Sequence, residues 1–385
     1  MIARTGKKGL KPVKRLSPNK QLPGVGDLSQ LKVWVLYPQL ETNDPNLEYY
    51  YDFSQSLAEY TRVFDELSIT WKWQPVTMGD IDPVVGRIRK ASGKRVPVVL
   101  NLCDGDEING TPGISVIHAL EKHRLIYTGA NAFFYDITTS KIPMKEAFEK
   151  AGVPTAPWAV VTKASIPGLV NRVGAPLILK PAVSGGSMGV SVKNVVYTQR
   201  ELEDRVAEIE NGYRGWNLLA DGLLAEGFIN GPEFTTFVVG SAQGKIKVYP
   251  AVERVFHESL PDEEKFLSFD RLWEIYEEEK PMPADANFYE YAVPDPKLHD
   301  ELERISIAAY EAVAAVGYGR IDIRMDKATG KLYVLEINAQ CGISEDDNFT
   351  SIGAILKVAK TSFTQLVREI ITDAFVRRGI ELRSK

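Results

Sequence analysis

The sequence has little cysteine and little histidine. Among its 385 residues are 2 cysteines and 4 histidines, and no CxxC pair or His/Cys cluster occurs. This excludes a disulfide scaffold, a zinc ribbon and an iron–sulfur site, and it favours a reducing compartment. No apolar run reaches the roughly 20 residues that a bilayer span needs, and no signal-peptide pattern follows Met1. We therefore expect a soluble cytoplasmic protein with no membrane partner, whose chemistry uses carboxylates, lysine and arginine.

Acidic residues are absent from the first 26 positions, which carry Arg4, Lys7, Lys8, Lys11, Lys14, Arg15 and Lys20. This composition predicts a flexible basic tail, either a plain solvated terminus or an arm for targeting or polyanion binding. The whole chain has 46 basic and 51 acidic side chains and a net charge of −5. An acidic protein of this kind is not expected to bind nucleic acid.

Strand and helix patterns alternate through the first third of the chain. LKVWVLYP from Leu31 and VPVVLNL from Val96 predict strands, and SQSLAEYTRVFDELSI and ISVIHALEKHR have helical spacing. This alternation predicts an α/β domain with a mostly parallel sheet and a ligand crevice at its carboxyl edge. A helix that ends at Gly152 belongs to a new unit, which starts at about residue 130. We predict a tail over 1–28, an N-terminal domain over 29–129, and two further units over 130–225 and 226–385.

A glycine-rich turn interrupts the apolar segments of LILKPAVSGGSMGVSVKNV. Gly185, Gly186 and Gly189 allow the backbone to point N–H groups into a concavity that suits phosphate oxygens, and Lys180 stands at the preceding strand end. Strands flank the loop, so neither a Walker A loop nor a dinucleotide fingerprint fits, because both open a helix. An ordinary glycine hairpin is the alternative, which Lys180 disfavours.

Two carboxylates and an amide are predicted to converge in GYGRIDIRMDKATGKLYVLEINAQCG. The segment predicts a hairpin, in which alternation places Arg320 and Asp322 on one face of the first strand and Glu336 and Asn338 on one face of the second. A bulge would bring Asp322 opposite Glu336. These hard oxygen ligands suit Mg²⁺ that is held partly by nucleotide phosphates. The alternative is a surface hairpin with solvated charges.

The order of these motifs resembles the ATP-grasp superfamily, in its D-alanine–D-alanine ligase-like branch. The matching blocks are Lys141, Lys180-Pro181, SGGSMG, EGFINGPEF, GRID and LEIN. The resemblance implies an α/β fold, α+β in the C-terminal unit, with an open parallel sheet domain and two domains that clasp ATP. It implies a ligase that phosphorylates a carboxylate and lets an amine displace the phosphate. The implied cofactors are ATP and Mg²⁺, with Mn²⁺ as a substitute. The implied partners are a small-molecule carboxylate and amine, and a homodimer is compatible with the family.

The resemblance also carries residue roles to matching positions. It implies ATP binding by Lys141, Lys180, Gly185, Gly186, Ser187, Gly189, Glu226, Gly227, Phe228, Ile229 and Glu233. Glu226 would face the adenine amino group and Glu233 the ribose hydroxyls. The metal ligands would be Asp322, Glu336 and Asn338. Catalysis would use Arg320 at the reacting oxygens, the Gly342 N–H at the oxyanion, and Ser344 near the substrate carboxylate. Cys341 without a neighbouring histidine is a poor nucleophile candidate.

The sequence departs from strict D-alanine ligases where the substrate would bind. Those ligases have a carboxylate after the first strand, and Glu41 is the only candidate for its role in this sequence. Their histidine after the second strand is replaced by Cys103. We therefore expect a ligase for an amino acid or related metabolite that is not strictly D-alanine. The alternatives are a D-alanine–D-alanine ligase proper and a small-molecule phosphotransferase on the same fold. The acidic stretch 257–287 would be a lid, whose charge either attracts a cationic amine or forms a solvated face.

Overall fold

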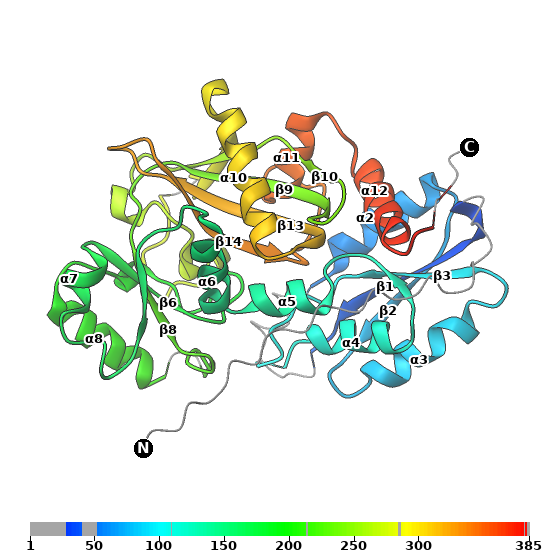
Figure 1. Cartoon of the computed structure of the whole chain (residues 1–385), viewed down its shortest axis with the longest axis horizontal. Coiled ribbons are helices and arrows are strands. Elements are labelled where there is room, and N and C mark those ends of the chain that lie inside the picture. The colour runs from blue at the N-terminus through cyan, green and yellow to red at the C-terminus, as the bar shows by residue number, and fades with distance from the viewer. Residues whose placement is uncertain are drawn as a thin grey trace, which may run out of the picture.

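The computed structural model describes residues 28–40, 52–108, 110–212, 215–283, 286–380 and 382. These residues form three sheets with helices around them (Figure 1). The predicted basic tail lies outside the described residues except for residue 28, and Glu41 lies outside them too. None of the described helices combines the length and the apolar character that a membrane crossing requires.

The N-terminal sheet is parallel, as the sequence predicts. Its strand order is β2-β1-β3-β4, with β1 (Leu31–Pro38), β2 (Thr70–Val76), β3 (Val96–Asn101) and β4 (Ile126–Tyr127). Helices cover both faces, so β1 is almost continuously apolar. Val33 and Val35 pack in one core with α2 (Ser54–Glu66). Trp34 and Leu36 pack in the other core with α3 (Ile81–Ala91) and α4 (Ile114–Lys122).

Two helices lead from this domain to the central unit, α5 (Ala132–Thr139) and α6 (Lys141–Ala151). The α6 helix ends as predicted at Gly152, whose φ of 72° is the left-handed conformation that glycine adopts without strain. The central sheet is antiparallel with the order β5-β8-β6-β7, from β5 (Trp158–Val161), β6 (Leu177–Pro181), β7 (Val195–Val196) and β8 (Leu223–Gly227). It carries α7 (Leu169–Val173) and α8 (Gln199–Glu210), which pack over it in one core.

The C-terminal sheet is antiparallel with the order β12-β11-β9-β13-β14, and β10 pairs with β9. Its strands are β9 (Glu233–Ser241), β10 (Ile246–Val248), β11 (Val252–Phe256), β12 (Tyr289–Ala292), β13 (Val316–Met325) and β14 (Leu332–Ala339). The predicted hairpin is β13–β14, with a register shift after Asp322 as expected. The short helices η3 (Asp262–Glu264) and α9 (Phe269–Trp273) lie between β11 and β12.

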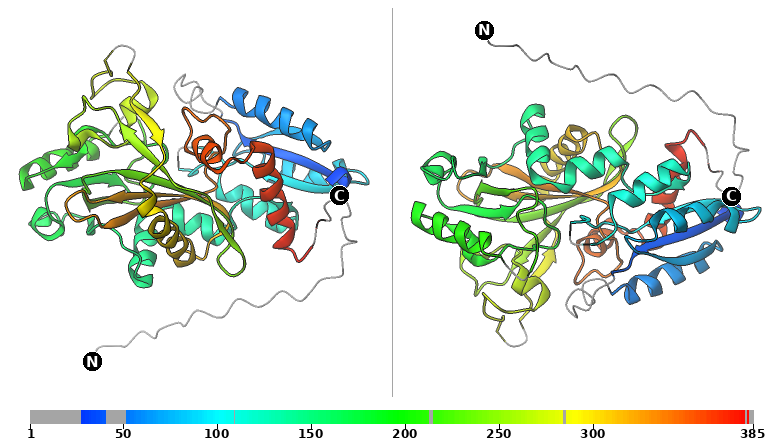
Figure 2. Two further views of the ribbon diagram at one scale, coloured as in Figure 1. Left: turned by 90° about the horizontal axis from the view of Figure 1, so that it is seen from above. Right: turned by 90° about the horizontal axis from the view of Figure 1, so that it is seen from below.

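Three helices of the described chain pack against this sheet, and the last of them also contacts the N-terminal domain. They are α10 (His299–Ala312), α11 (Ser351–Ala359) and α12 (Phe363–Val376). From above, α12 lies between the C-terminal sheet and the N-terminal domain (Figure 2). There the Thr364 hydroxyl donates a hydrogen bond to Glu66 of α2 (2.5 Å). The apolar side chains of α12 share one core with α2 and β1, so the last helix joins the first domain to the last sheet.

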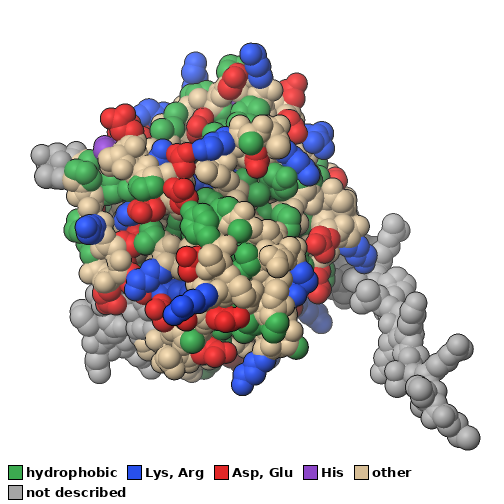
Figure 3. All heavy atoms as spheres, turned by 90° about the vertical axis from the view of Figure 1, so that its left-hand side faces the viewer, with side chains coloured by type: hydrophobic (Ala, Val, Ile, Leu, Met, Phe, Trp, Pro, Cys, Tyr) green, Lys and Arg blue, Asp and Glu red, His purple; other side chains and the backbone are tan. Residues whose placement is uncertain are grey.

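Each of the three sheets belongs to one of the units into which we divide the chain. We propose the units 29–129, 130–225 and 226–385 as three parts around one cavity. One element crosses the second bound, because β8 pairs with β5 and β6 up to Gly227. On the face that looks out from the left of Figure 1, basic and acidic side chains alternate (Figure 3). The described residues on that face form no continuous basic surface of the kind that binds nucleic acid.

Candidate active site

A cavity of about 480 Å³ lies between the three sheets. Most of the residues expected from the sequence line it: Lys141, Lys180, Gly185, Gly186, Ser187, Glu226, Gly227, Phe228, Ile229, Glu233, Arg320, Asp322, Glu336, Asn338, Gly342 and Ser344. Two expected residues do not line it, namely Gly189 and Cys103. The tertiary structure therefore brings together motifs from α6, the glycine loop, β8 and the β13–β14 hairpin.

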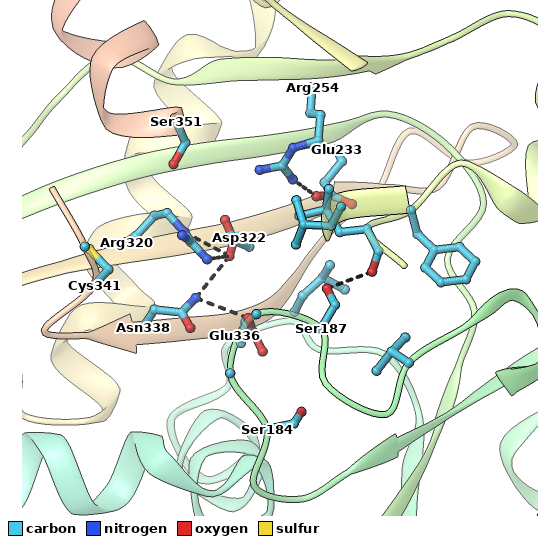
Figure 4. A pocket seen from close by; sticks show the side chains of 18 of the residues that line it. Ser184, Ser187, Glu233, Arg254, Arg320, Asp322, Glu336, Asn338, Cys341 and Ser351 are labelled. Atoms are coloured by element: carbon cyan, nitrogen blue, oxygen red, sulfur yellow. Dashed lines mark hydrogen bonds and ion pairs between the residues drawn. The ribbon is translucent and has the colours of Figure 1, made fainter. Parts of the chain in front are cut away.

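The glycine loop after β6 turns through left-handed conformations, with φ of 53° at Gly186, 63° at Ser187 and 74° at Gly189. A Cβ on Gly189 would come within 2.8 Å of the side chains of Pro181 and Leu218, so this glycine serves packing. Ser187 donates its hydroxyl hydrogen bond to the carbonyl of Leu267 (2.9 Å), as Figure 4 shows. The loop is thus tied to the segment between β11 and β12.

Glu226 lies between two lysines in the middle of the central sheet. Lys180 Nζ is 2.7 Å from Glu226 Oε2, and the fully buried Lys145 pairs with Glu226 Oε1. Burial opposes ionisation of Glu226, but the charges of Lys145 and Lys180 overcome it and lower its pKa to about 2. Burial likewise lowers the pKa of Lys145. Lys145 was not predicted as a site residue. Its position one helical turn after Lys141 places both on one face of the helix and was a usable signal.

A second buried trio lies across three strands of the C-terminal sheet. Arg254 of β11 and Arg324 of β13 stand opposite Glu233 of β9 in the strand register. Arg254 donates a hydrogen bond to Glu233 Oε1, and Arg324 Nε lies 3.5 Å from Glu233 Oε2. The Arg324 guanidinium also stacks 5.2 Å from the ring centre of Phe228. Arg254 was not predicted, because it stands on a strand with no recognisable motif.

The β13–β14 hairpin aligns the predicted metal ligands. Asp322 stands opposite Glu336, and Arg320 opposite Asn338. Asn338 Nδ2 donates to Asp322 Oδ2 (3.0 Å) and Glu336 Oε1 (3.2 Å), and Arg320 Nη2 lies 2.8 Å from Asp322 Oδ2 (Figure 4). Burial opposes ionisation of Glu336, but Lys141, Lys180 and Arg320 lower its pKa.

This donor set fits a divalent cation. Two carboxylates and an amide are hard ligands, and magnesium accepts them together with substrate phosphates. Among the described residues, no group of three or more His, Cys, Asp or Glu side chains is arranged so that it could hold a metal ion by itself. A metal ion at this hairpin would therefore need oxygens from a bound nucleotide to complete its coordination.

The opposite end of the cavity is formed by the loop after β14. Ser344 donates its hydroxyl to Glu59 Oε1 of α2 (2.6 Å), so its hydroxyl faces the N-terminal domain. Gly342 is exposed in the cavity. Ser351, the first residue of α11, also lines the cavity and was not predicted (Figure 4). Its signal was the Thr-Ser pair before an apolar run, which marks a helix start.

The two cysteines occupy different places. Cys103 belongs to a hydrophobic core and does not line the cavity, and burial raises the pKa of its thiol. Our expectation that Cys103 contacts substrate is therefore not supported. Cys341 lines the cavity, but burial raises its pKa to about 12. A thiol that stays protonated is a poor nucleophile, which agrees with the sequence argument.

The segment 257–283 covers the glycine loop as a lid. Trp273 Nε1 donates to the carbonyl of Gly186 (2.8 Å), and Phe269 N donates to the carbonyl of Val190 (2.8 Å). The lid residues that line the cavity are Phe266, Leu267, Leu272 and Trp273, with no acidic residue among them. Instead, Glu279 lies 3.4 Å from Arg271, and Glu278 lies 3.1 Å from Arg205 of the central unit. Glu278 and Glu279 therefore fasten the lid, whereas Glu263, Glu274 and Glu277 are exposed, as the alternative of a solvated face predicts.

The fold and this site define an ATP-grasp protein. Solved structures of D-alanine–D-alanine ligases align with it: one from Bacillus anthracis complexed with ATP (TM-score 0.60, 17% identity, 90% of this chain and 98% of that one) and one from Coxiella burnetii (TM-score 0.61, 18%, 91% and 96%). Curated D-alanine–D-alanine ligases of Marinobacter nauticus and Pseudoalteromonas translucida are each 28% identical over 66% of this chain and 68% and 72% of their own lengths.

A family model makes the assignment specific. Residues 147–372, more than half of the chain, match the family described as D-ala D-ala ligase C-terminus. The chain belongs to this family and is an ATP-dependent ligase of the D-alanine–D-alanine ligase type.

Proposed function

We propose that the chain joins two amino acids through an amide bond at the expense of ATP, with D-alanine as the first substrate to test on both sides. The sequence alone favoured an amino acid or related metabolite that is not strictly D-alanine. The relatives are named D-alanine–D-alanine ligases, and they favour a D-alanine ligase proper instead. The observation that carries the proposal is a single cavity lined by the glycine loop, the Asp322–Glu336–Asn338 set and the loop at Gly342.

ATP would occupy the side of the cavity between the central sheet and the hairpin. Apolar side chains of Ile178, Val190, Phe228 and Phe266 form a small core there, which suits an adenine ring. Lys141 Nζ lies 3.6 Å from Glu336 and donates to Ser184 of the glycine loop (3.2 Å), so it stands between loop and metal ligands. It would hold phosphate oxygens. The Bacillus anthracis neighbour is complexed with ATP, which supports ATP as the nucleotide for this cavity.

Asp322, Glu336 and Asn338 would hold Mg²⁺, for which Mn²⁺ could substitute. Such an ion supplies positive charge to the transferring phosphoryl group. Arg320 remains charged beside Asp322 and supplies a second cation on the same side of the hairpin. Phosphoryl transfer requires mainly alignment and charge stabilisation, which this arrangement of fixed groups provides.

The reaction would have two steps. A carboxylate oxygen of the first amino acid attacks the γ-phosphorus, the bond to the β-phosphate oxygen breaks, and ADP leaves. The ammonium group of the second amino acid loses one proton to solvent, and the free amine nitrogen then attacks the acyl carbon. Phosphate departs with its oxygen, and the nitrogen releases one further proton and keeps the last as the amide N–H. In the second step the Gly342 N–H would donate to the oxyanion. Arg320 would stabilise the reacting oxygens in both steps.

A coupled assay tests this function. The full chain is incubated with ATP, Mg²⁺ and D-alanine, and ADP, phosphate and product masses are measured, with panels of other D- and L-amino acids beside it. We expect ADP and phosphate in equal amounts together with a dipeptide mass. A stable phosphorylated acceptor would identify a phosphotransferase instead. The absence of amino-acid-dependent ADP release would contradict the ligase proposal.

Two further expectations remain predictions. They are a homodimer and a cytoplasmic location. Gel filtration with light scattering measures the first, and fractionation of the source cells measures the second.

A further inference from the structure

One charged residue of the cavity differs from all the others. The charged residues that line it are Asp104, Lys141, Lys180, Glu226, Glu233, Arg254, Arg320, Asp322, Arg324 and Glu336. Nine of these ten lie in ion pairs with one another or with Lys145. Asp104 is the exception, because no other described residue donates a hydrogen bond to its carboxylate or lies in an ion pair with it.

Asp104 stands where a ligand would reach it. It follows β3 by three residues, at the carboxyl edge of the parallel sheet, where loops form ligand crevices. Its side chain is exposed, yet burial of its surroundings raises its pKa to about 6. Because Asp104 is exposed and also lines the cavity, its carboxylate faces the cavity. A carboxylate that faces a cavity without a counter-charge is stabilised by a cationic partner.

Its neighbours supply no such partner. Phe53, Ser56 and Leu102 line the cavity from the same domain and are all uncharged. The nearby Glu107 is already used, since it accepts the backbone N–H of Ser115 at 2.7 Å. Among the described residues of this wall, none supplies the cation that Asp104 lacks.

Asp104 lines the same cavity as Arg320, Cys341 and Gly342. Cys341 directly precedes Gly342, whose N–H is the proposed donor to the oxyanion. A molecule with its carboxylate among the cations around Arg320 would thus extend past Gly342 toward Asp104. The two ends of this part of the cavity have opposite charge, which matches a zwitterion.

We propose that Asp104 binds the ammonium group of the amino acid whose carboxylate is phosphorylated. The inference rests on the proposed function and specifies its substrate class: an acid that carries a cationic nitrogen close to its carboxylate. It assigns to the end of β3 a role that the sequence had offered to Glu41, which follows β1. Because β1 and β3 are adjacent strands, both loops open on the same edge of the sheet.

The test compares two acids that differ in the ammonium group alone. D-alanine and propionate are offered with ATP and Mg²⁺, and hydroxylamine traps the acyl phosphate as a hydroxamate. The wild type should favour D-alanine by about 10- to 100-fold in kcat/KM, the size expected for a hydrogen bond between charged groups. Asp104→Asn should lose most of this preference through a raised KM for D-alanine, and its KM for ATP should not change.

Asp106→Asn is the matched control. Asp106 lies two residues away and does not line the cavity, so this variant should keep the wild-type preference. If Asp104→Asn keeps the preference while the wild type is active, the proposal is wrong. A loss in Glu41→Gln alone would assign the ammonium site to Glu41.

A binding measurement separates this inference from the proposed function. If the wild type releases no ADP with any amino acid, the function fails on that result. Calorimetry with D-alanine and propionate, in the presence of ATP and Mg²⁺, then judges Asp104 independently. Tighter binding of D-alanine that is lost in Asp104→Asn supports the inference. Equal binding of the two acids by the wild type overturns it.

Discussion

The nucleotide side of the cavity and the wall at the end of β3 differ in how their charges are arranged. On the nucleotide side, Glu226 lies between two lysines and Glu233 between two arginines. At the other wall, Asp104 has no partner among the described residues. The first arrangement holds side chains in place before a ligand arrives, which keeps the reorganisation that accompanies catalysis small. The second leaves a charge whose partner must come with the substrate, and so it selects the substrate.

The largest expected effect comes from neutralising the hairpin carboxylates. Asp322→Asn and Glu336→Gln keep the size of each side chain and remove a negative charge that a metal ion would need. We expect each to lower kcat by at least about 1,000-fold, or about 4 kcal/mol. The amide formation assay measures this, with melting temperature as the check on folding. Glu303→Gln on the exposed face of α10 is the control. Near-normal rates would remove the metal assignment.

Loss of a buried partner should destabilise the nucleotide side more than any surface change. Lys145→Met leaves Glu226 with one lysine instead of two in a fully buried position. We expect the free energy of unfolding to fall by about 3–5 kcal/mol, as when other buried pairs are broken. Urea denaturation measures it.

A double variant separates stability from function in the same trio. Lys145→Met with Glu226→Leu removes both buried charges and should regain most of the lost stability. It should still bind ATP weakly, because the residue expected to face the adenine amino group is gone. Full ATP affinity in the double variant would contradict that role of Glu226.

The contact between lid and glycine loop should have a smaller effect. Trp273→Phe keeps a smaller aromatic ring and removes the hydrogen bond to the Gly186 carbonyl, worth about 1 kcal/mol. We expect KM for ATP to rise about fivefold with little change in melting temperature. Trp158→Phe is a matched control, since the buried indole N–H of Trp158 donates no hydrogen bond. An unchanged KM would mean that the lid holds the loop by its other contacts.

The smallest effect concerns the free energy of unfolding of the ligand-free protein, and it comes from Asp104. Because the folded pKa of about 6 exceeds the ordinary 3.8, the folded state binds more protons between these values. The free energy of unfolding therefore falls as pH rises through this window, and the penalty is complete above it. Asp104→Asn should be more stable than the wild type at pH 7.5, by at most about 1 kcal/mol because the side chain is exposed and screened.

Melting curves at several pH values measure this difference. The gain should disappear below about pH 4, where Asp104 is protonated in both states. A gain that does not change with pH would mean that the carboxylate is well hydrated. The contrast between the two walls would then be weaker than the structure indicates.

Motifs that lie close together in the sequence were predicted well. The alternation of Arg320, Asp322 and Arg324, the bulge after Asp322 and the turn at Gly186 follow from local backbone geometry. Lys145 and Arg254 were missed because their partners stand 81 and 21 residues away. The ion pair between Glu278 of the lid and Arg205 was missed for the same reason, since these residues meet only in the folded chain. No local pattern contains such contacts.

The sequence by itself determined the strand periods, the glycine turn, the donor types of the hairpin and the order of the motifs. All of these depend on residues that are neighbours along the chain. Only the tertiary structure decided which charges are paired and which one is free to meet a substrate. Pairing depends on distances of a few ångströms between strands that are remote in sequence, and on the burial that makes an unpaired charge costly. For that reason Asp104, unremarkable in the sequence, became the residue that specifies the substrate we expect.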